Sequence, residues 1–111
     1  MNLSKLSDYH RGWFILGSEF SPKVFESNVE LGCRNYKAGD EEQCHYHSKA
    51  IEVNLVTFGV ALFIVNGKDV IVKDGEIILI EKNEAVEFHA VSDCQIICFK
   101  SVSVENDKYL I

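Results

Sequence analysis

The sequence predicts an all-β domain, built as a barrel or sandwich of about ten short antiparallel strands. From residue 12 onward, short runs rich in Val, Ile and Phe alternate with Gly, Asn and Asp turn signals. The sequence has a single proline, Pro22, so most of these runs can pair along both edges. No apolar pattern with a 3.6-residue period is long enough to indicate a helix.

The turn signals divide the chain into its expected elements. Asn66-Gly67 lies between VALFIV and DVIV and is the strongest hairpin signal. Asp74-Gly75 and Gly39-Asp40 indicate two further tight turns. Residues 1–10 are polar and are expected to form a loosely held arm. We therefore expect strands at 12–16, 23–26, 30–37, 43–47, 51–58, 60–66, 69–73, 76–81, 85–91 and 94–102.

Composition limits the classes of function. The 111 residues, 47% of them hydrophobic, are expected to form one domain over 1–111 with one core. A net charge of −6 without a basic run argues against binding to nucleic acid or to an anionic membrane. The longest apolar run, residues 60–65, is too short to span a bilayer, and the N-terminus lacks a secretory signal. We expect a cytoplasmic protein whose four cysteines, none in a CxxC pair, are reduced.

A metal-binding pattern begins at His45 and His47. Alternate side chains of a strand share a face, so both imidazoles point the same way. Glu52 follows at the start of an apolar run, where a buried carboxylate needs a partner. If the two strands run side by side, these three side chains converge, and they suit a divalent transition metal with open coordination positions. The spacing alone leaves a surface or hydrogen-bonded histidine pair as the alternative.

Residues 39–59 also resemble the first sequence motif of the cupin family at every defining position, and residues 75–90 are similar to the second motif. The resemblance covers about 30–105. It implies a double-stranded β-helix, which is a small jelly-roll barrel. It also implies one divalent metal, of which iron, manganese, nickel and zinc are all admissible, held by His45, His47 and Glu52. The residues that match the first motif are Gly39, His45, His47, Glu52 and Gly59.

The second motif departs from the family pattern at two places. Lys82 and Asn83 replace the usual proline and glycine, and asparagine tolerates the left-handed conformation that glycine supplies. Val86 stands where the family has its fourth metal ligand, a histidine. His89 could substitute for it only if a bulge reversed the strand, because alternation places His89 on the face opposite to Val86.

Several residues are expected to line a ligand pocket. Arg34 and Tyr36 share one face of the strand that leads to Gly39, and in cupins one face of this strand lines the pocket. A guanidinium there would bind a substrate carboxylate or phosphate; the alternative places Arg34 outside and Cys33 inside. The remaining expected lining residues, whose apolar members could equally be core, are Asn54, Phe58, Val86 and Phe88.

The expected function is that of a small metal-binding cupin with a small organic ligand, sugar-like or carboxylate. The family-level reactions are isomerisation and dioxygenase cleavage. The alternative is a non-catalytic binding or regulatory cupin without a tightly bound metal, which the missing fourth ligand favours and the complete first motif opposes. A third hypothesis is a protein-interaction module, for which IICF at 96–99 is the candidate patch. Because cupins often pair through their sheets, a homodimer is also expected.

Overall fold

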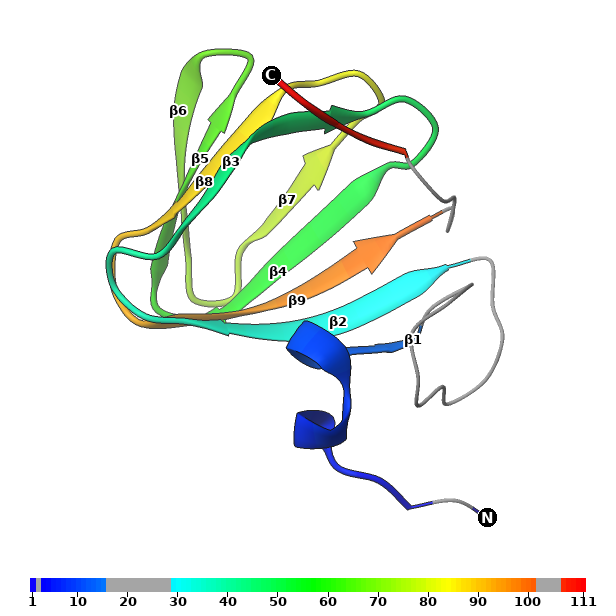
Figure 1. Ribbon diagram of the computed structural model, residues 1–111. Coiled ribbons are helices and arrows are strands. Elements are labelled where there is room, and N and C mark those ends of the chain that lie inside the picture. The colour runs from blue at the N-terminus through cyan, green and yellow to red at the C-terminus, as the bar shows by residue number, and fades with distance from the viewer. Residues whose placement is uncertain (2, 16–28, 102–106) are drawn as a thin grey trace.

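The computed structural model describes residues 1, 3–15, 29–101 and 107–111. Two short 3-10 turns, η1 (Leu6–Asp8) and η2 (His10–Gly12), precede the strands. Ten strands lie within the described residues (Figure 1). They are β1 (Trp13–Ile15), β2 (Glu30–Tyr36), β3 (Glu41–His47), β4 (Glu52–Phe58), β5 (Val60–Val65), β6 (Lys68–Lys73), β7 (Ile77–Ile80), β8 (Val86–Ala90), β9 (Cys94–Lys100) and β10 (Lys108–Leu110).

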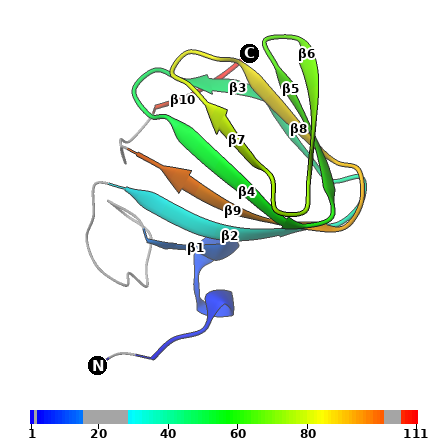
Figure 2. The same cartoon turned by 180° about the vertical axis from the view of Figure 1, so that it is seen from behind.

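The strands form two five-stranded sheets, in the orders β1-β2-β9-β4-β7 and β10-β3-β8-β5-β6. Every pairing is antiparallel, and the two sheets face each other across the barrel interior (Figures 1 and 2). This confirms the all-β jelly-roll prediction. The strand expected at 23–26 lies outside the described residues. None of the helices in the described ranges has the length and hydropathy needed to cross a membrane.

The apolar core fills the part of the barrel between β5, β6 and β8 of one sheet and β4, β7 and β9 of the other. Alternation along each strand turns one row of apolar side chains inward. At the open edge of this core, the rings of Tyr36 and Phe88 pack with centroids 4.5 Å apart. The core residues are Val56, Ala61, Phe63, Val72, Ile80, Val86, Phe88, Ala90, Cys94 and Ile96.

Left-handed turns occur where the sequence predicted them. Asn66 and Gly67 have φ angles of 49° and 81°, which the two central residues of a type I′ hairpin require. Asn83 has a φ of 65° and so takes the conformation of the family's usual glycine. The substitution of asparagine at this position therefore preserves the turn before β8.

Two irregularities in strand register decide which side chains face the interior. On β3, Glu42 lies opposite Phe88 and His45 lies opposite Val86, so one extra residue is inserted between them. This bulge places Glu42 and His45 on the same inner face although their numbers differ by three. A second register shift, between Val56 and Phe58 on β4, ends the regular alternation of that strand.

The two ends of the described chain were predicted least well. The N-terminal segment, expected to be a loose arm, forms η1 and η2 and buries Tyr9. The C-terminal strand β10 was not predicted, because three residues give too short a pattern to identify from sequence. It extends the second sheet by pairing Leu110 with His45 and Lys108 with His47. A sequence-distant segment thus lies directly beside the histidine strand.

Candidate functional site

His45 and His47 lie side by side on the inner face of β3. Both are buried, with 5% and 6% of their surface exposed, and their ring centroids are 5.2 Å apart. Nδ1 of His45 donates a hydrogen bond to the Gln43 carbonyl oxygen at 2.8 Å, and Nδ1 of His47 donates to the Asp107 carbonyl oxygen at 3.1 Å. A carbonyl oxygen can only accept, so Nδ1 carries the hydrogen in each ring. The lone pair of each neutral imidazole is therefore on Nε2.

Asp107 holds in place both His47 and the loop that follows it. Its carboxylate accepts hydrogen bonds from the backbone amides of Ser48, Lys49 and Ala50 and from the Ser48 hydroxyl, at 2.7–3.2 Å. Burial alone would raise the pKa of Asp107, but these hydrogen bonds outweigh it and lower the pKa below its usual value. The link between β3 and β4 is thus fixed by a residue from the far end of the chain.

Two buried polar atoms in the described structure have no hydrogen-bond partner, Nε2 of His47 and Nδ2 of Asn54. Buried polar groups are almost always paired, so each of these atoms is available to a ligand group, an ion or a water molecule. The pKa of His47 is lowered, chiefly by burial and next by the positive charge of Lys100, although Glu52 acts in the opposite direction. His47 is therefore neutral at neutral pH, with an Nε2 lone pair available for a metal or a hydrogen-bond donor.

Glu52, the third expected metal ligand, extends from β4, where its backbone lies opposite Lys100 of β9 and Ile80 of β7. The Cys98 thiol donates a hydrogen bond to its Oε1 at 3.3 Å. Burial, and then the charge of Glu52, raises the pKa of Cys98 well above its usual value, which keeps this thiol protonated.

The histidine pair fits a metal, because each ring has its Nδ1 committed to a carbonyl and its Nε2 free, as metal-binding histidines do. A complete set of ligands is not assembled. Across the residues that the structure describes, no three His, Cys, Asp or Glu side chains come together as a metal-binding group. In this conformation the site therefore offers two imidazole donors, and Glu52 does not join them as a third.

A charged cluster lies beside the histidines, toward the open end of the barrel. Arg34 of β2 faces inward, with 13% of its side chain exposed, and its Nη2 is 3.2 Å from Oε1 of Glu42. Arg11, from η2, reaches the same oxygen at 3.4 Å. Burial opposes ionisation of Glu42, but the positive charges of Arg34 and its neighbours lower the pKa of this carboxyl overall. Glu42 is thus a partly buried carboxylate held ionised by guanidinium groups.

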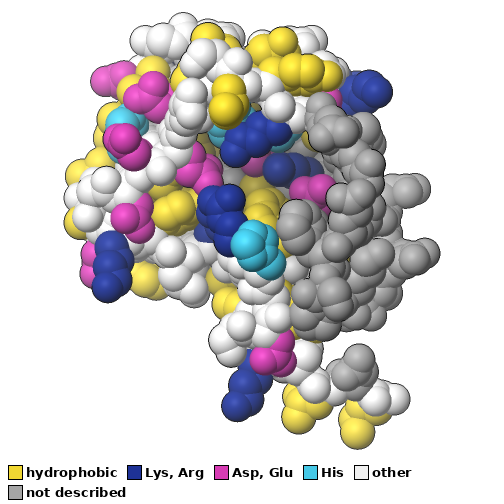
Figure 3. All heavy atoms as spheres, viewed as in Figure 1, with side chains coloured by type: hydrophobic (Ala, Val, Ile, Leu, Met, Phe, Trp, Pro, Cys, Tyr) yellow, Lys and Arg dark blue, Asp and Glu magenta, His cyan; other side chains and the backbone are white. Residues whose placement is uncertain are grey.

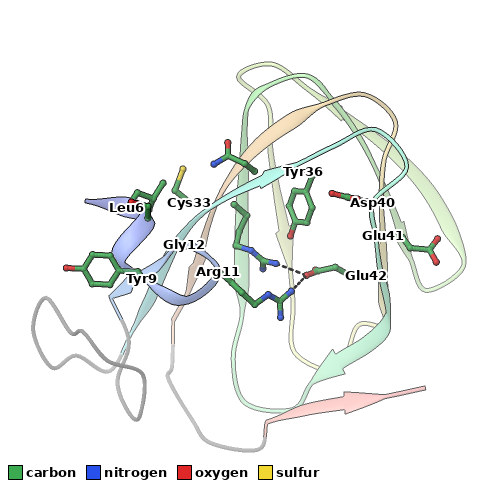
Figure 4. Close-up of a pocket in the computed structure, with 12 residues that line it drawn as sticks. Leu6, Tyr9, Arg11, Gly12, Cys33, Tyr36, Asp40, Glu41 and Glu42 are labelled. Atoms are coloured by element: carbon green, nitrogen blue, oxygen red, sulfur yellow. Dashed lines mark hydrogen bonds and ion pairs between the residues drawn. The ribbon is translucent and has the colours of Figure 1, made fainter. Parts of the chain in front are cut away.

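This cluster lines a cleft of about 730 Å³ between the N-terminal turns and the first residues of β3. Figure 3 shows side chains of both charges gathered around a hollow at this end of the molecule. In Figure 4, Arg11, Tyr36 and Glu42 point toward one another, whereas Glu41 points away. The cleft therefore combines an aromatic wall with charged groups, as small-molecule sites do.

The remaining sequence-predicted residues fall into three groups. Asn54 faces the interior, and Val86 and Phe88 are core residues packed behind the histidines. His89 lies on the outer face of β8, bonded to Glu87 and 3.3 Å from Glu41, so it does not face the pair. Phe58 departs from the prediction: it is 47% exposed, because the register shift after Val56 turns it outward. It does not line the cleft.

Four charged residues of this region were not singled out from the sequence. Glu42 follows the predicted Gly39-Asp40 turn as the last of three consecutive acidic residues, and only the β3 bulge turns it inward. Arg11 and Asp107 come from the ends of the chain, where no periodic pattern gives them a position. Lys100 was hidden at the end of an apolar strand; its Nζ lies 3.6 Å from Glu30 and 5.0 Å from the Trp13 ring centroid. The one sequence signal that could have identified Lys100 was a charged residue at the end of an apolar run.

Comparison with known families matches the cupin domain to residues 33–100, well over half of the chain. The chain belongs to the cupin family. Comparison with curated protein sequences found no match.

Solved structures agree on the fold. KdgF from Halomonas sp. is 14% identical, with a TM-score of 0.67 over 77% of each chain. A cupin-2 domain protein from Shewanella frigidimarina is 18% identical, with a TM-score of 0.61 over 68% of this chain and 72% of that one. Salicylate 1,2-dioxygenase from Pseudaminobacter salicylatoxidans is 14% identical, with a TM-score of 0.66 over 73% of this chain but 23% of that one. At such identities the likeness is one of fold.

Proposed function

We propose that this cupin binds a divalent transition metal through Nε2 of His45 and Nε2 of His47, and holds a small organic ligand beside it. The observation that carries the proposal is the committed hydrogen bonding of both Nδ1 atoms, together with a buried, unpartnered Nε2 on His47. Burial lowers the pKa of His47, which keeps that ring in the neutral form that a metal requires.

Glu52 is the proposed third ligand. It is on the strand that follows the histidines, and its charge acts on His47. The Cys98 thiol now occupies one of its oxygens, so metal binding would have to compete with that hydrogen bond. A bound metal would supply Lewis-acid chemistry and open coordination positions, and iron(II), manganese(II), nickel(II) and zinc(II) all accept such nitrogen and oxygen donors. Asn54 would donate its free Nδ2 hydrogens to an oxygen of the ligand.

Metal content per chain tests this proposal. The protein is expressed in metal-supplemented medium and measured by plasma mass spectrometry beside His45→Ala/His47→Ala. The matched control is His89→Ala, which removes an imidazole from the outer face of the same sheet. We expect stoichiometric metal in the parent and in the control, and loss of metal in the double variant. Equal metal in all three, or none in the parent, would contradict the proposal.

A second function is favoured by one observation, the absence of a three-ligand group among the described residues. In this alternative the chain is a non-catalytic binding or regulatory cupin, and the two Nε2 atoms accept hydrogen bonds from an organic ligand. The solved structures named above include both a dioxygenase and a KdgF protein, so the shared fold does not choose between reactions. Ligand binding that is unchanged in metal-depleted protein would favour this alternative.

A further inference from the structure

Arg11 and Arg34 are the only arginines in the sequence, and both contact the same oxygen of Glu42. They come from different elements, η2 and β2, so the chain brings them together only by folding. The Arg34–Glu42 pair is partly buried, whereas Arg11 is exposed, and an exposed ion pair such as Arg11–Glu42 contributes little to stability. The contribution of Arg11 to this cluster therefore calls for an explanation other than stability.

Arg34 is held rigidly. Its guanidinium carbon lies 5.2 Å from the Tyr36 ring centroid and 5.8 Å from the Trp13 ring centroid, so two aromatic rings contact it. Such cation–π contacts restrict the orientation of a long side chain. Arg34 thus presents a fixed guanidinium at the wall of the cleft.

Arg11 is the exposed member, with 54% of its side chain accessible. Its backbone has a φ of 52°, and Gly12 after it has a φ of 79°. A Cβ on Gly12 would lie 2.0 Å from the Cys33 carbonyl oxygen, so only glycine lets the turn rest against β2. Two successive left-handed residues thus aim the Arg11 side chain into the cleft, at a local cost in backbone strain.

The charges that line the cleft favour a ligand with a single negative charge. Among the described lining residues, Asp40 accepts the Lys37 amide and Glu41 pairs with His89, so neither contacts the guanidinium groups. The cleft is lined by two guanidinium groups and three carboxylates, so a carboxylate ligand would bind by taking a guanidinium group from Glu42. A monoanion would be repelled less by these carboxylates than a dianion.

We propose that Arg34 and Arg11 bind the carboxylate of a small monoanionic ligand, with Arg11 exchanging Glu42 for that carboxylate. This deepens the proposed function, on which it rests, by assigning the ligand class and a contribution from the N-terminal turn. Guanidinium groups pair with carboxylates through two parallel hydrogen bonds, which gives both affinity and orientation. Glu42 is a positioning residue that aligns both guanidinium groups before the ligand arrives.

Trp13, the only tryptophan, gives a local fluorescence reading of the cleft because its ring lies beside Arg34. The probes are benzoate and its uncharged isostere benzamide. We expect a saturable fluorescence change with benzoate and none with benzamide. Arg34→Met should weaken benzoate binding by about tenfold or more, Arg11→Met by a smaller factor, and the exposed control Lys37→Met should leave it unchanged.

Glu42→Gln gives the discriminating result, because removal of the competing carboxylate should tighten benzoate binding by several-fold. Each variant is first checked for an unchanged thermal midpoint. Benzamide binding as tightly as benzoate, full binding in Arg34→Met, or no benzoate response in either the parent or Glu42→Gln would overturn the proposal. Tighter binding of inorganic phosphate than of benzoate would also overturn it.

The assay is repeated on chelator-treated protein and on His45→Ala/His47→Ala. If benzoate binds to both of these samples and the parent contains no metal, the metal-site proposal is wrong and the carboxylate-site proposal is supported. If the parent contains stoichiometric metal but binds benzoate and benzamide equally well, the metal-site proposal is supported and the carboxylate-site proposal is wrong. The two proposals therefore fail separately.

Discussion

At the scale of the residue, the site depends on which nitrogen of each imidazole carries the hydrogen. The Gln43 and Asp107 carbonyls fix this choice for His45 and His47, and both carbonyls come from the backbone. A substitution of the Gln43 or Asp107 side chain therefore leaves the carbonyl oxygen that accepts from the imidazole in the chain. The arrangement makes the two Nε2 lone pairs a property of the fold.

Asn54→Leu tests whether a buried polar group is kept for binding and not for stability. Its Nδ2 has no partner in the described structure, so an apolar side chain of similar size removes an unsatisfied donor. We expect the free energy of unfolding in urea to stay the same or rise by up to about 1 kcal/mol. A fall of more than about that amount would mean that Asn54 has a structural partner.

Asp107 predicts an acid-dependent loss of stability. Its pKa is lowered in the folded chain, so its contribution is complete above the unfolded value of about 3.9 and is lost as pH falls through the lower folded value. Asp107→Asn should lower the unfolding free energy at neutral pH by about 1–3 kcal/mol. It should also flatten the dependence of that free energy on pH in the acid range. Parallel pH profiles for the variant and the parent would contradict the assignment.

At the scale of the element, the strand pattern and the turns were predictable, and the bulges were not. Strict alternation correctly placed His89 on the outer face of β8. It failed for Phe58 and for Glu42, because one inserted residue reverses every later side chain and leaves no compositional sign. The spacing predicted the histidine pair as neighbours, but the carboxylate nearest to the arginines came from a bulge.

The packing of η2 against β2 explains the role of the N-terminal turn. Gly12→Ala would place a Cβ against the Cys33 carbonyl and force a left-handed φ on alanine, so the turn should lift from β2. We expect benzoate binding to fall to the level of Arg11→Met, although both arginines are retained. Circular dichroism should show an unchanged barrel. Benzoate affinity equal to that of the parent would show that the turn does not position Arg11.

At the scale of the whole molecule, the β1-β2-β9-β4-β7 sheet has polar side chains at one end of its inner face and apolar side chains on its outer face. Its inner face carries Arg34, Glu52, Asn54 and Lys100. Cross-strand pairing on its outer face joins apolar residues over four strands. The ends of this face on β7 are well exposed, Ile77 at 65% and Leu79 at 50%. The outer-face residues are Leu31, Cys33, Val53, Leu55, Ile77, Leu79, Ile97 and Phe99.

A homodimer through this face stays a prediction. Two copies of a chain with a net charge of −6 repel, but this face presents no charge in its paired rows and can be placed against itself about a two-fold axis. We expect a dimer by light scattering and a monomer for Ile77→Lys/Leu79→Lys. Ile71→Lys, on the other sheet, is the control. A monomeric parent, or a dimer that survives the double variant, would contradict the prediction.

The central claim is that two imidazoles, each with its Nδ1 bonded to a carbonyl, present Nε2 to a metal inside the barrel. Nitrogen-15 NMR of the four histidine side chains, before and after addition of zinc, tests it most directly. We predict that Nδ1 carries hydrogen in both rings, that His47 starts as a neutral ring, and that zinc shifts the Nε2 resonances of His45 and His47 while those of His89 stay unchanged. Zinc that shifts His89 instead, or rings that carry hydrogen on Nε2 before zinc is added, would contradict the account.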